Sequence, residues 1–175
     1  RRMGQEIKIV PLGFDTLIDA LEKGVIDVIA SGMTITEERA GRVDFSNPYY
    51  VSGQGILVRS TDKRRFRSLA SLKGRVIAVQ IGTTGAQLAA KIPDARVKVF
   101  NVTSEAFIEL RQKGADAVIL DKPVITQFLR SNPRAATGLS LQPAIFEAES
   151  FGFAVRKGRT ELLGGINKAL ENIHA

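Results

Sequence analysis

A repeated unit constrains the fold of this chain more than any other feature of its sequence. Residues 7–30 read IKIVPLGFDTLIDALEKGVIDVIA, and residues 97–120 read VKVFNVTSEAFIELRQKGADAVIL. Each copy has a β-branched apolar run, helical spacing that ends at Lys-Gly, and then an aspartate and a second apolar run. This alternation of strand and helix is typical of α/β layers with largely parallel sheets. Because the unit occurs twice, we expect two similar lobes rather than one continuous sheet.

The boundaries of the lobes follow from two extended segments that contain glycine. Residues 51–58 and 150–155 are natural crossings between the lobes. We therefore place lobe 1 at residues 1–54 and 152–175, and lobe 2 at residues 55–151. Apolar runs predict strands at residues 6–10, 26–30, 75–80, 96–100, 115–120 and 150–155, and helical spacing predicts helices that start near residues 14, 37, 85, 103, 123 and 162.

The stretch after the strand at residues 26–30 carries binding chemistry. Gly32 allows close backbone approach, and Thr34 offers a hydroxyl just ahead of a helix for which Thr36 is a good N-cap. Arg39 lies about one turn inside that helix, where its guanidinium can point back at the turn. A hydroxyl, backbone N–H groups and a forked cation are what a small carboxylate requires. A capped surface helix with an exposed arginine accounts for the same residues.

Two further strand ends carry polar residues. Gly82-Thr83-Thr84-Gly85 opens a helix, and its N–H groups can bind an anion, although it lacks the lysine of a phosphate loop and the dinucleotide fingerprint. Asp121 ends an apolar strand, where a buried unpaired carboxylate is costly. A threonine-capped turn and a solvent-facing helix cap before Pro123 are the structural alternatives. Ligands of open α/β sheets bind beyond the carboxyl ends of strands, so arginine, N–H donors and aspartate together complement a zwitterionic α-amino acid.

Composition narrows the classes of function. The chain has no cysteine, and its one histidine is His174, so disulfides, thiolate metal sites, histidine-rich metal sites and Ser-His-Asp catalysis are not expected. We expect neither a metal nor a cofactor. The net charge is +7, with cations concentrated at residues 63–67, which fits a solvated loop or a patch for a partner or lipid headgroups. With 6% aromatic residues and no stacking motif, no nucleic-acid partner is expected.

The chain resembles the polar amino-acid family of periplasmic solute-binding proteins of ABC transporters over nearly all its length. The motif ASGMTITEERAGRVDFSNPYY is highly specific for this family, and LKGRVIAVQIGTTG and KGADAVILDKP support it. The resemblance implies a type II periplasmic-binding fold, in which two α/β lobes close over the ligand about a two-strand hinge. It implies a protein that is not an enzyme and that delivers a free amino acid to a membrane permease. The implied location is periplasmic, or extracellular with a lipid anchor.

The resemblance also implies roles for individual residues. Arg39 should grip the ligand carboxylate, assisted by Thr34 and the backbone N–H of Thr84. Asp121 should hold the α-ammonium group. Phe14 matches a wall of the side-chain pocket and Gln80 a position that varies with the ligand, which favours arginine, lysine or glutamine over acidic ligands. The full set of expected ligand-binding residues is Arg39, Asp121, Thr34, Thr84, Thr83, Gly32, Ser31, Phe14, Gln80 and Leu120.

One departure from the family pattern concerns the ends of the chain. Family members begin with a strand, a loop with pocket residues and a first helix, and here only a helix tail at residues 1–4 is expected. The C-terminus also stops early, at Ala175. We therefore expect lobe 1 to lack a central strand and to expose apolar surface.

Three other functions fit the same fold. A sensory domain of a receptor or sensor kinase shares these features. A dehydratase-like enzyme would need a catalytic acid, for which Glu147 and Glu149 lie near the second crossing. The effector domain of a regulator would agree with the positive charge; this sequence includes no helix-turn-helix, and a longer protein could carry one ahead of it.

Overall fold

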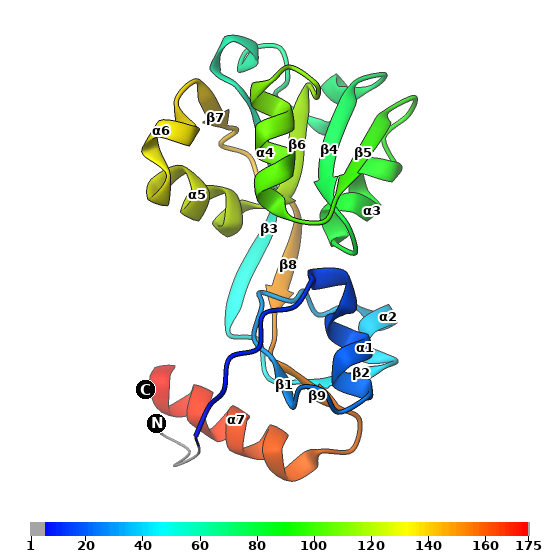
Figure 1. The fold of residues 1–175 in the computed structure, drawn as a ribbon, viewed down its shortest axis with the longest axis vertical. Helices are drawn as coiled ribbons and strands as arrows, with labels where there is room; N and C mark the ends of the chain where they lie inside the picture. The colour runs from blue at the N-terminus through cyan, green and yellow to red at the C-terminus, as the bar shows by residue number, and fades with distance from the viewer. Residues whose placement is uncertain (1–5, 175) are drawn as a thin grey trace. The chain divides into compact units, whose positions relative to one another are not determined.

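The computed structural model describes residues 6–174, so the helix tail expected at residues 1–4 lies outside the described part. The chain forms two units. It passes from one unit to the other within β3 (Tyr50–Arg59) and again within β8 (Phe146–Phe151) (Figure 1). Unit 1 comprises Arg1–Val51 and Glu149–Ala175, and unit 2 comprises Ser52–Ala148.

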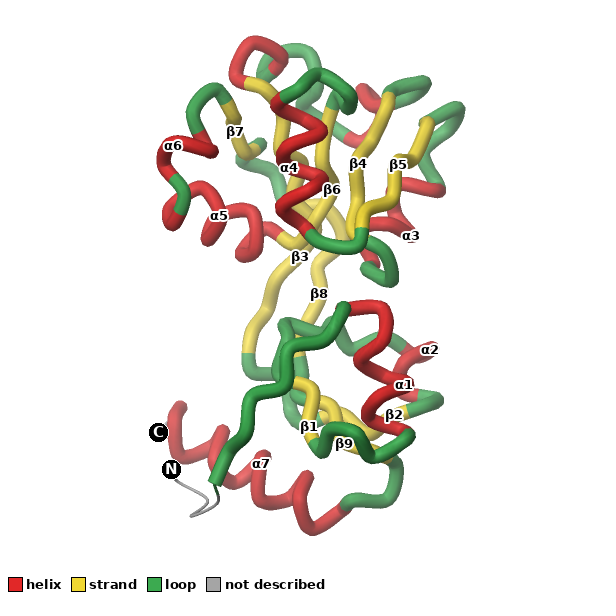
Figure 2. The backbone as a smooth tube through the Cα atoms, viewed as in Figure 1, coloured by secondary structure: helices red, strands yellow, loops and turns green. Residues whose placement is uncertain are grey.

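The described part of unit 2 is built on a mixed sheet with the strand order β5-β4-β6-β3-β7, and β8 pairs with β3. The strands β4, β5 and β6 are parallel, whereas β3 runs antiparallel to β6 and β7 (Figure 2). Their bounds are β4 (Val76–Gln80), β5 (Arg96–Phe100), β6 (Ala117–Asp121) and β7 (Leu139–Leu141). The second copy of the repeat therefore supplies β5 and β6, and β4 lies between them.

Helices cover both faces of this sheet, which explains why its central strands read as continuous apolar runs. Ile77 and Ile119 pack with Leu88 on one face, and Val118 packs with Phe107 on the other. This is the period-two alternation of strand side chains. The helices of unit 2 are α3 (Thr84–Ala90), α4 (Thr103–Arg111), α5 (Lys122–Ser131) and α6 (Pro133–Ala136), with 3-10 turns η2 (Ser60–Asp62) and η3 (Leu69–Leu72).

Unit 1 holds a smaller sheet in the order β1-β9-β2. Both outer strands run antiparallel to β9, so this sheet differs from the expected parallel arrangement. The central strand of this sheet is β9, which comes more than 100 residues after β1 and β2 and does not belong to a strand–helix–strand repeat with them. The elements are η1 (Phe14–Thr16), α1 (Leu17–Glu22), β1 (Val28–Ile29), α2 (Glu37–Ala40), β2 (Val43–Phe45), β9 (Ala154–Arg156) and α7 (Thr160–His174).

Two strand predictions in unit 1 need correction. Residues 6–10 form no strand, and the side chains of Ile7 and Ile9 are 77% and 87% exposed. An alternating apolar run becomes a strand only where a neighbour supplies ladder hydrogen bonds, and the described sheet of unit 1 does not include this segment. The strand expected at residues 150–155 is interrupted, because β8 ends at Phe151 and β9 begins at Ala154.

The interruption falls at a glycine in a tight place. A Cβ atom on Gly152 would lie 3.0 Å from Cδ1 of Ile35 and 3.1 Å from Cδ1 of Phe45. The backbone of this glycine therefore lies against the apolar side chains of unit 1.

Neither a membrane span nor a metal cluster is found in residues 6–174. None of the helices there combines the length and the apolar character needed to cross a bilayer. Over the same residues, acidic, histidine and cysteine side chains form no group of three or more that could hold a metal ion.

Candidate functional site

The first polar cluster lies in unit 1, and we call Phe14, Thr34, Arg39 and Glu149 the arginine cluster. Thr36 caps α2 as predicted, since its Oγ1 accepts from the backbone N–H of Arg39 at 3.2 Å. The Arg39 side chain is not an exposed surface group, because the residue is only 8% exposed. Its Nη1 donates to the carbonyl oxygen of Thr34 at 2.8 Å, and its guanidinium carbon lies 5.6 Å from the centre of the Phe14 ring. These two contacts fix the orientation of the guanidinium group.

Thr34 is held to the last residues of β8. It forms an isolated antiparallel bridge with Phe151, and the neighbouring Ile35 N–H donates to the carbonyl of Ser150 at 2.9 Å. The Thr34 hydroxyl donates to Oε2 of Glu149 at 2.8 Å. Glu149 was considered from the sequence only as a catalytic acid, and the structure instead makes it the partner of the threonine expected to assist carboxylate binding.

Ser31 and Gly32 lie on the turn that leads into the arginine cluster. Ser31 is exposed. Gly32 has a φ of +62°, a backbone conformation that favours glycine, and a Cβ atom there would meet the Phe151 ring at 3.5 Å. The glycine is therefore needed for the shape of the turn, whatever backbone contacts it makes with a ligand.

The second polar cluster lies in unit 2, and we call Gln54, Thr84 and Asp121 the aspartate cluster. All three residues are buried, with Gln54 fully so and the other two 8% exposed. The side-chain amide Nε2 of Gln54 donates to Oγ1 of Thr84 and to Oδ1 of Asp121, each at 3.0 Å. Asp121 occupies the N-cap position of α5, but its side chain makes no capping hydrogen bond. The structure thus orients this carboxylate through Gln54 rather than through the helix.

The turn before α3 lies against the aspartate cluster. Thr83 caps the helix, because its Oγ1 accepts from the backbone N–H of Ala86 at 3.2 Å and donates to the carbonyl of Gln80 at 2.8 Å. A Cβ atom on Gly85 would lie 2.7 Å from Oε1 of Gln54. Glycine at this position lets α3 approach the buried amide closely.

Gln80 and Leu120 were also predicted to bind the ligand, and each has partners of its own outside the three residues of the aspartate cluster. The amide of Gln80 donates to the carbonyl of Asn101 at 3.1 Å. Leu120 is 2% exposed and packs into the core beside α4 and α5. Its burial there gives it a packing role, which the resemblance had not indicated.

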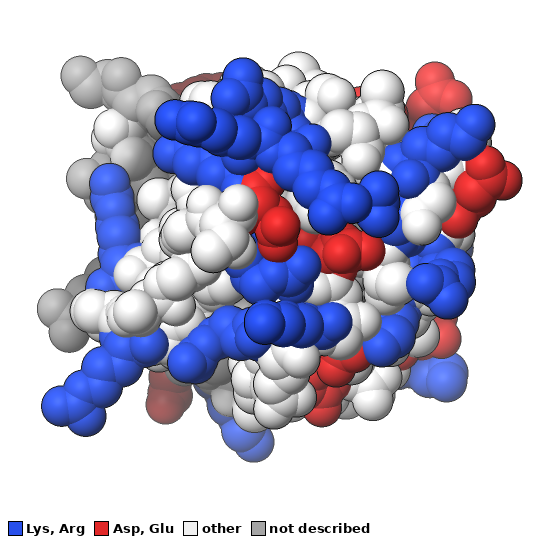
Figure 3. Space-filling view, turned by 90° about the horizontal axis from the view of Figure 1, so that it is seen from above, with Lys and Arg blue, Asp and Glu red and all other residues white. Residues whose placement is uncertain are grey.

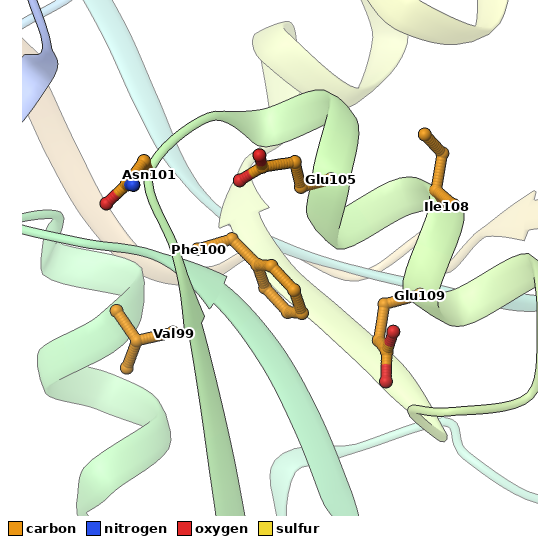
Figure 4. A pocket seen from close by; sticks show the side chains of 6 residues that line it. All are labelled: Val99, Phe100, Asn101, Glu105, Ile108 and Glu109. Carbon is orange, nitrogen blue, oxygen red and sulfur yellow. The ribbon is translucent and has the colours of Figure 1, made fainter.

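A hollow of about 410 Å³ lies near Gln80 at the edge of unit 2. Figure 4 shows that its lining side chains come from β5, the following turn and α4. Its carboxylate Glu109 is already paired with Lys98 at 2.5 Å. None of the predicted ligand-binding residues lines this hollow. The lining residues are Val99, Phe100, Asn101, Glu105, Ile108 and Glu109.

Gln54 is the residue of this site that sequence reasoning missed. It stands between two glycines in the run VSGQGILV, where one uncharged polar residue interrupts an apolar strand. A fully buried polar side chain needs hydrogen-bond partners, so this interruption is the signal that identifies it.

The two clusters offer complementary chemistry. A guanidinium group presents a planar fork of donors that matches the two oxygens of a carboxylate. A buried carboxylate favours a cationic partner, because desolvation is costly for a carboxylate without one. Each cluster is built from residues of one unit only.

A family profile decides the class of protein. The profile of the bacterial extracellular solute-binding proteins, family 3, matches residues 1–175. The chain belongs to this family. The resemblance stated from the sequence motifs is therefore confirmed, and the family consists of solute-binding proteins rather than enzymes.

Curated relatives of this family 3 chain carry names of amino-acid-binding proteins. It is 32% identical over 172 residues to a probable histidine-binding protein of Campylobacter jejuni, covering 98% of this chain and 66% of that protein. It is 36% identical over 180 residues to the L-arginine-binding protein of Pseudomonas aeruginosa, covering 99% of this chain and 69% of that protein. It is 34% identical over 158 residues to an ABC transporter glutamine-binding protein of Bacillus subtilis, covering 90% and 56%. The chain thus spans between about half and about two thirds of the length of these relatives.

Solved structures establish the fold. Holo ArgBP from T. maritima is 43% identical with a TM-score of 0.91, and the match covers 99% of this chain and 75% of that one. An ancestral arginine-binding protein bound to arginine gives the same identity with a TM-score of 0.92, covering 99% and 76%. The predicted α/β type II periplasmic-binding fold is therefore confirmed.

Proposed function

We propose that this chain is part of a protein that captures a free amino acid and delivers it to the membrane permease of an ABC transporter. The observation that carries this proposal is the burial of two groups of opposite charge, Arg39 and Asp121, each oriented by neighbours within its own unit. An α-amino acid carries the matching pair of charges. Names of relatives that bind arginine, histidine and glutamine support the same class of ligand.

Arg39 is the proposed partner of the ligand carboxylate. Its guanidinium is preorganised, since the carbonyl of Thr34 accepts from Nη1 and the Phe14 ring lies beside it. Preorganisation lowers the entropy lost when a ligand binds. Thr34, Thr83, the N–H of Thr84, Ser31 and Gly32 remain proposed contacts to the same ligand.

Asp121 is the proposed partner of the ligand ammonium group. In the aspartate cluster, the amide of Gln54 donates to Oδ1 of this carboxylate. An ionised carboxylate can accept several hydrogen bonds. Asp121 can therefore accept from a ligand ammonium group in addition to the amide of Gln54.

The side chain of the ligand is proposed to be polar or basic, as in arginine, lysine or glutamine. Phe14 provides an aromatic face, on which a guanidinium or ammonium group can lie. Gln80 and Leu120 are the proposed specificity positions, with Leu120 acting through its packing in the core. The family is bacterial and extracellular, and we propose a periplasmic or lipid-anchored protein within that location.

A thermal-shift screen of the twenty amino acids tests this function. It is run on this chain and on the longest form of the protein that the gene encodes. Ligand at about 100 times its dissociation constant should add roughly 2.7 kcal/mol of stability, so one or two basic or polar amino acids should stand out. If no amino acid raises the melting temperature of either form, the proposed function is wrong.

A further inference from the structure

The net positive charge of this protein comes from unit 2. Unit 1 contains ten Lys and Arg against eleven Asp and Glu, which gives a net charge of −1. Unit 2 contains fifteen Lys and Arg against seven Asp and Glu, which gives +8. Because the two units differ this much in net charge, we ask where the cations of unit 2 lie.

The cations gather at one end of the sheet in unit 2. Because β4, β5 and β6 are parallel, their amino ends meet at one edge and their carboxyl ends at the other. Arg75 precedes β4 and Arg96 begins β5, and the backbone N–H of Arg96 donates to the carbonyl of Arg75 at 2.8 Å. Because β3 runs antiparallel to β6, its last residues also lie at the amino edge, and the chain continues from there into the loop of residues 60–68. We call the surface formed by Lys63, Arg64, Arg65, Arg67, Arg75 and Arg96 the basic face.

Figure 3 shows Lys and Arg side chains over much of the molecular surface in the view from above, with acidic groups between some of them. The acidic residues near the basic face already have partners. Asp62 lies 2.8 Å and Asp116 3.7 Å from the guanidinium of Arg59, and Asp94 lies 3.7 Å from Lys73. Within residues 6–174, no ion pair involves any of the four loop cations, which are Lys63, Arg64, Arg65 and Arg67. Their charge is therefore not neutralised by the protein itself.

The loop that carries these cations is fixed from the inside. Phe66 is 1% exposed, and the guanidinium groups of Arg65 and Arg75 lie 5.1 Å and 5.6 Å from the centre of its ring. The buried Gln142 donates through Nε2 to the carbonyls of Lys63 and Phe66, at 2.8 Å and 2.7 Å. The backbone is thus anchored by a buried ring and a buried amide, while the four loop cations stay exposed. This arrangement differs from a run of cations on a chain without internal contacts.

The composition of the basic face favours a lipid surface over a protein. The centre of a protein interface is enriched in aromatic residues and depleted of lysine. The exposed large apolar side chains of the described chain include none between residues 52 and 98. Four or more clustered Lys and Arg are instead a pattern that anionic headgroups attract. We propose that the basic face docks this protein on a bilayer surface rich in anionic headgroups.

Docking in this way leaves the proposed ligand residues accessible. Gln80 and Asp121 end β4 and β6, so they lie at the carboxyl edge of the sheet, a strand length of roughly 15 Å from the amino edge. The inference does not depend on which amino acid is bound, and it can fail while the proposed function holds.

Sedimentation with lipid vesicles tests the proposal. The chain should sediment with vesicles of 40% phosphatidylglycerol and 60% phosphatidylcholine at low ionic strength, and not with pure phosphatidylcholine vesicles. Replacing all four loop cations by Gln should raise the lipid concentration for half binding at least tenfold, because each cation near an anionic surface contributes roughly fivefold. Absence of sedimentation with the anionic vesicles overturns the proposal.

A matched variant separates the basic face from net charge. Lys8, Lys23, Arg156 and Lys168 are exposed and belong to unit 1, whereas the basic face belongs to unit 2, so their replacement by Gln removes the same charge. This variant should bind within about twofold of the unaltered chain, and an equal loss in both variants contradicts the proposal. Melting temperatures show whether each variant is folded.

A charge-conserving variant separates a lipid surface from a protein partner. With Arg64, Arg65 and Arg67 replaced by Lys, binding to anionic vesicles should persist, since attraction to headgroups depends on charge and not on the planar fork of arginine. Loss of binding in this variant, or displacement by soluble glycerol phosphate at an equal phosphate concentration, would point to a discrete pocket or a protein partner and would overturn the proposal.

Discussion

The side-chain amide of Gln54 donates a 3.0 Å hydrogen bond to the carboxylate of Asp121, and both residues are buried. The two lie opposite each other in the antiparallel pair of β3 and β6. The strand that links the two units therefore also orients the carboxylate that we propose for ligand binding. This relationship gives Gln54 a role in both stability and binding.

Removal of this amide should destabilise unit 2. Gln54→Leu keeps the approximate volume but removes a buried donor from the Asp121 carboxylate, which should cost about 1–3 kcal/mol in the free energy of unfolding. Urea unfolding followed by circular dichroism measures this change. Gln127→Leu, at an exposed position on α5, is the control and should change stability by less than about 0.5 kcal/mol. Equal effects of the two substitutions would refute the role of Gln54.

Arg39 should be essential for ligand binding. Arg39→Ala should weaken binding by about 2–5 kcal/mol, because truncating a buried, hydrogen-bonded cation leaves the ligand carboxylate desolvated without its partner. Isothermal titration calorimetry with the amino acid found in the screen measures this loss. Arg42 pairs with Asp19 and Glu22 on the surface, so Arg42→Ala should leave the affinity unchanged. Unchanged affinity in Arg39→Ala would remove Arg39 from the site.

Asp121 should recognise the ammonium group and not the carboxylate of the ligand. Asp121→Asn should weaken binding of the amino acid at least tenfold, since a charge-assisted hydrogen bond becomes a neutral one. The analogue that lacks the α-amino group should bind the variant and the unaltered chain with equal affinity. A parallel loss for both compounds would show that the substitution acts through the fold and not through the ammonium contact.

Two glycines should respond to alanine in opposite ways. A Cβ atom on Gly85 would lie 2.7 Å from Oε1 of Gln54 and 3.0 Å from the carbonyl of Ile119, so Gly85→Ala should cost about 1–3 kcal/mol. Gly164 in α7 has open space around it, so Gly164→Ala should stabilise the chain by about 0.5–1 kcal/mol. Denaturant midpoints of the two variants give both signs in one experiment.

The acid stability of unit 1 should depend on Asp44. The backbone N–H of Gly158 at 2.8 Å and the ammonium of Lys157 at 3.2 Å hold the pKa of the Asp44 carboxyl below its ordinary value of 3.8. A depressed pKa in the folded state stabilises the protein above pH 3.8, and this contribution is lost as the pH falls through the lower folded value. The melting temperature of Asp44→Asn should therefore fall less than that of the unaltered chain between pH 6 and pH 3. An identical fall in both proteins would exclude this role.

The sequence predicted the fold best where apolar periodicity was strong. The strands expected at residues 75–80, 96–100 and 115–120 correspond to β4, β5 and β6, because each is buried in one sheet whose neighbours are close in the chain. Residues 6–10 show the same periodicity but lack a described strand partner, so the pattern alone was insufficient. The sequence analysis missed β7 and the polar part of β8. Both are strands because they pair with β3, and their own residues show no strong apolar pattern.

The candidate site was predicted in part. Burial of Arg39 and Asp121 is consistent with the roles that the family motif implied, and those roles remain to be tested. Gln54 was missed because its partners, Thr84 and Asp121, are 30 and 67 residues away in the chain. Long-range hydrogen bonds of this kind leave no local periodicity to detect.

The position of β9 in the middle of the sheet of unit 1 bears on the order in which the protein is made. The strands β3, β4, β5 and β6 of unit 2 have all been synthesised by residue 121, whereas β1 and β2 have no described sheet partner other than β9, at residues 154–156. Contacts that join distant parts of a chain form slowly, because a long loop must first be closed. During translation, unit 2 can therefore fold while the earlier-made residues of unit 1 still wait for their central strand, and in that interval the nascent chain exposes the apolar side chains that β9 will cover.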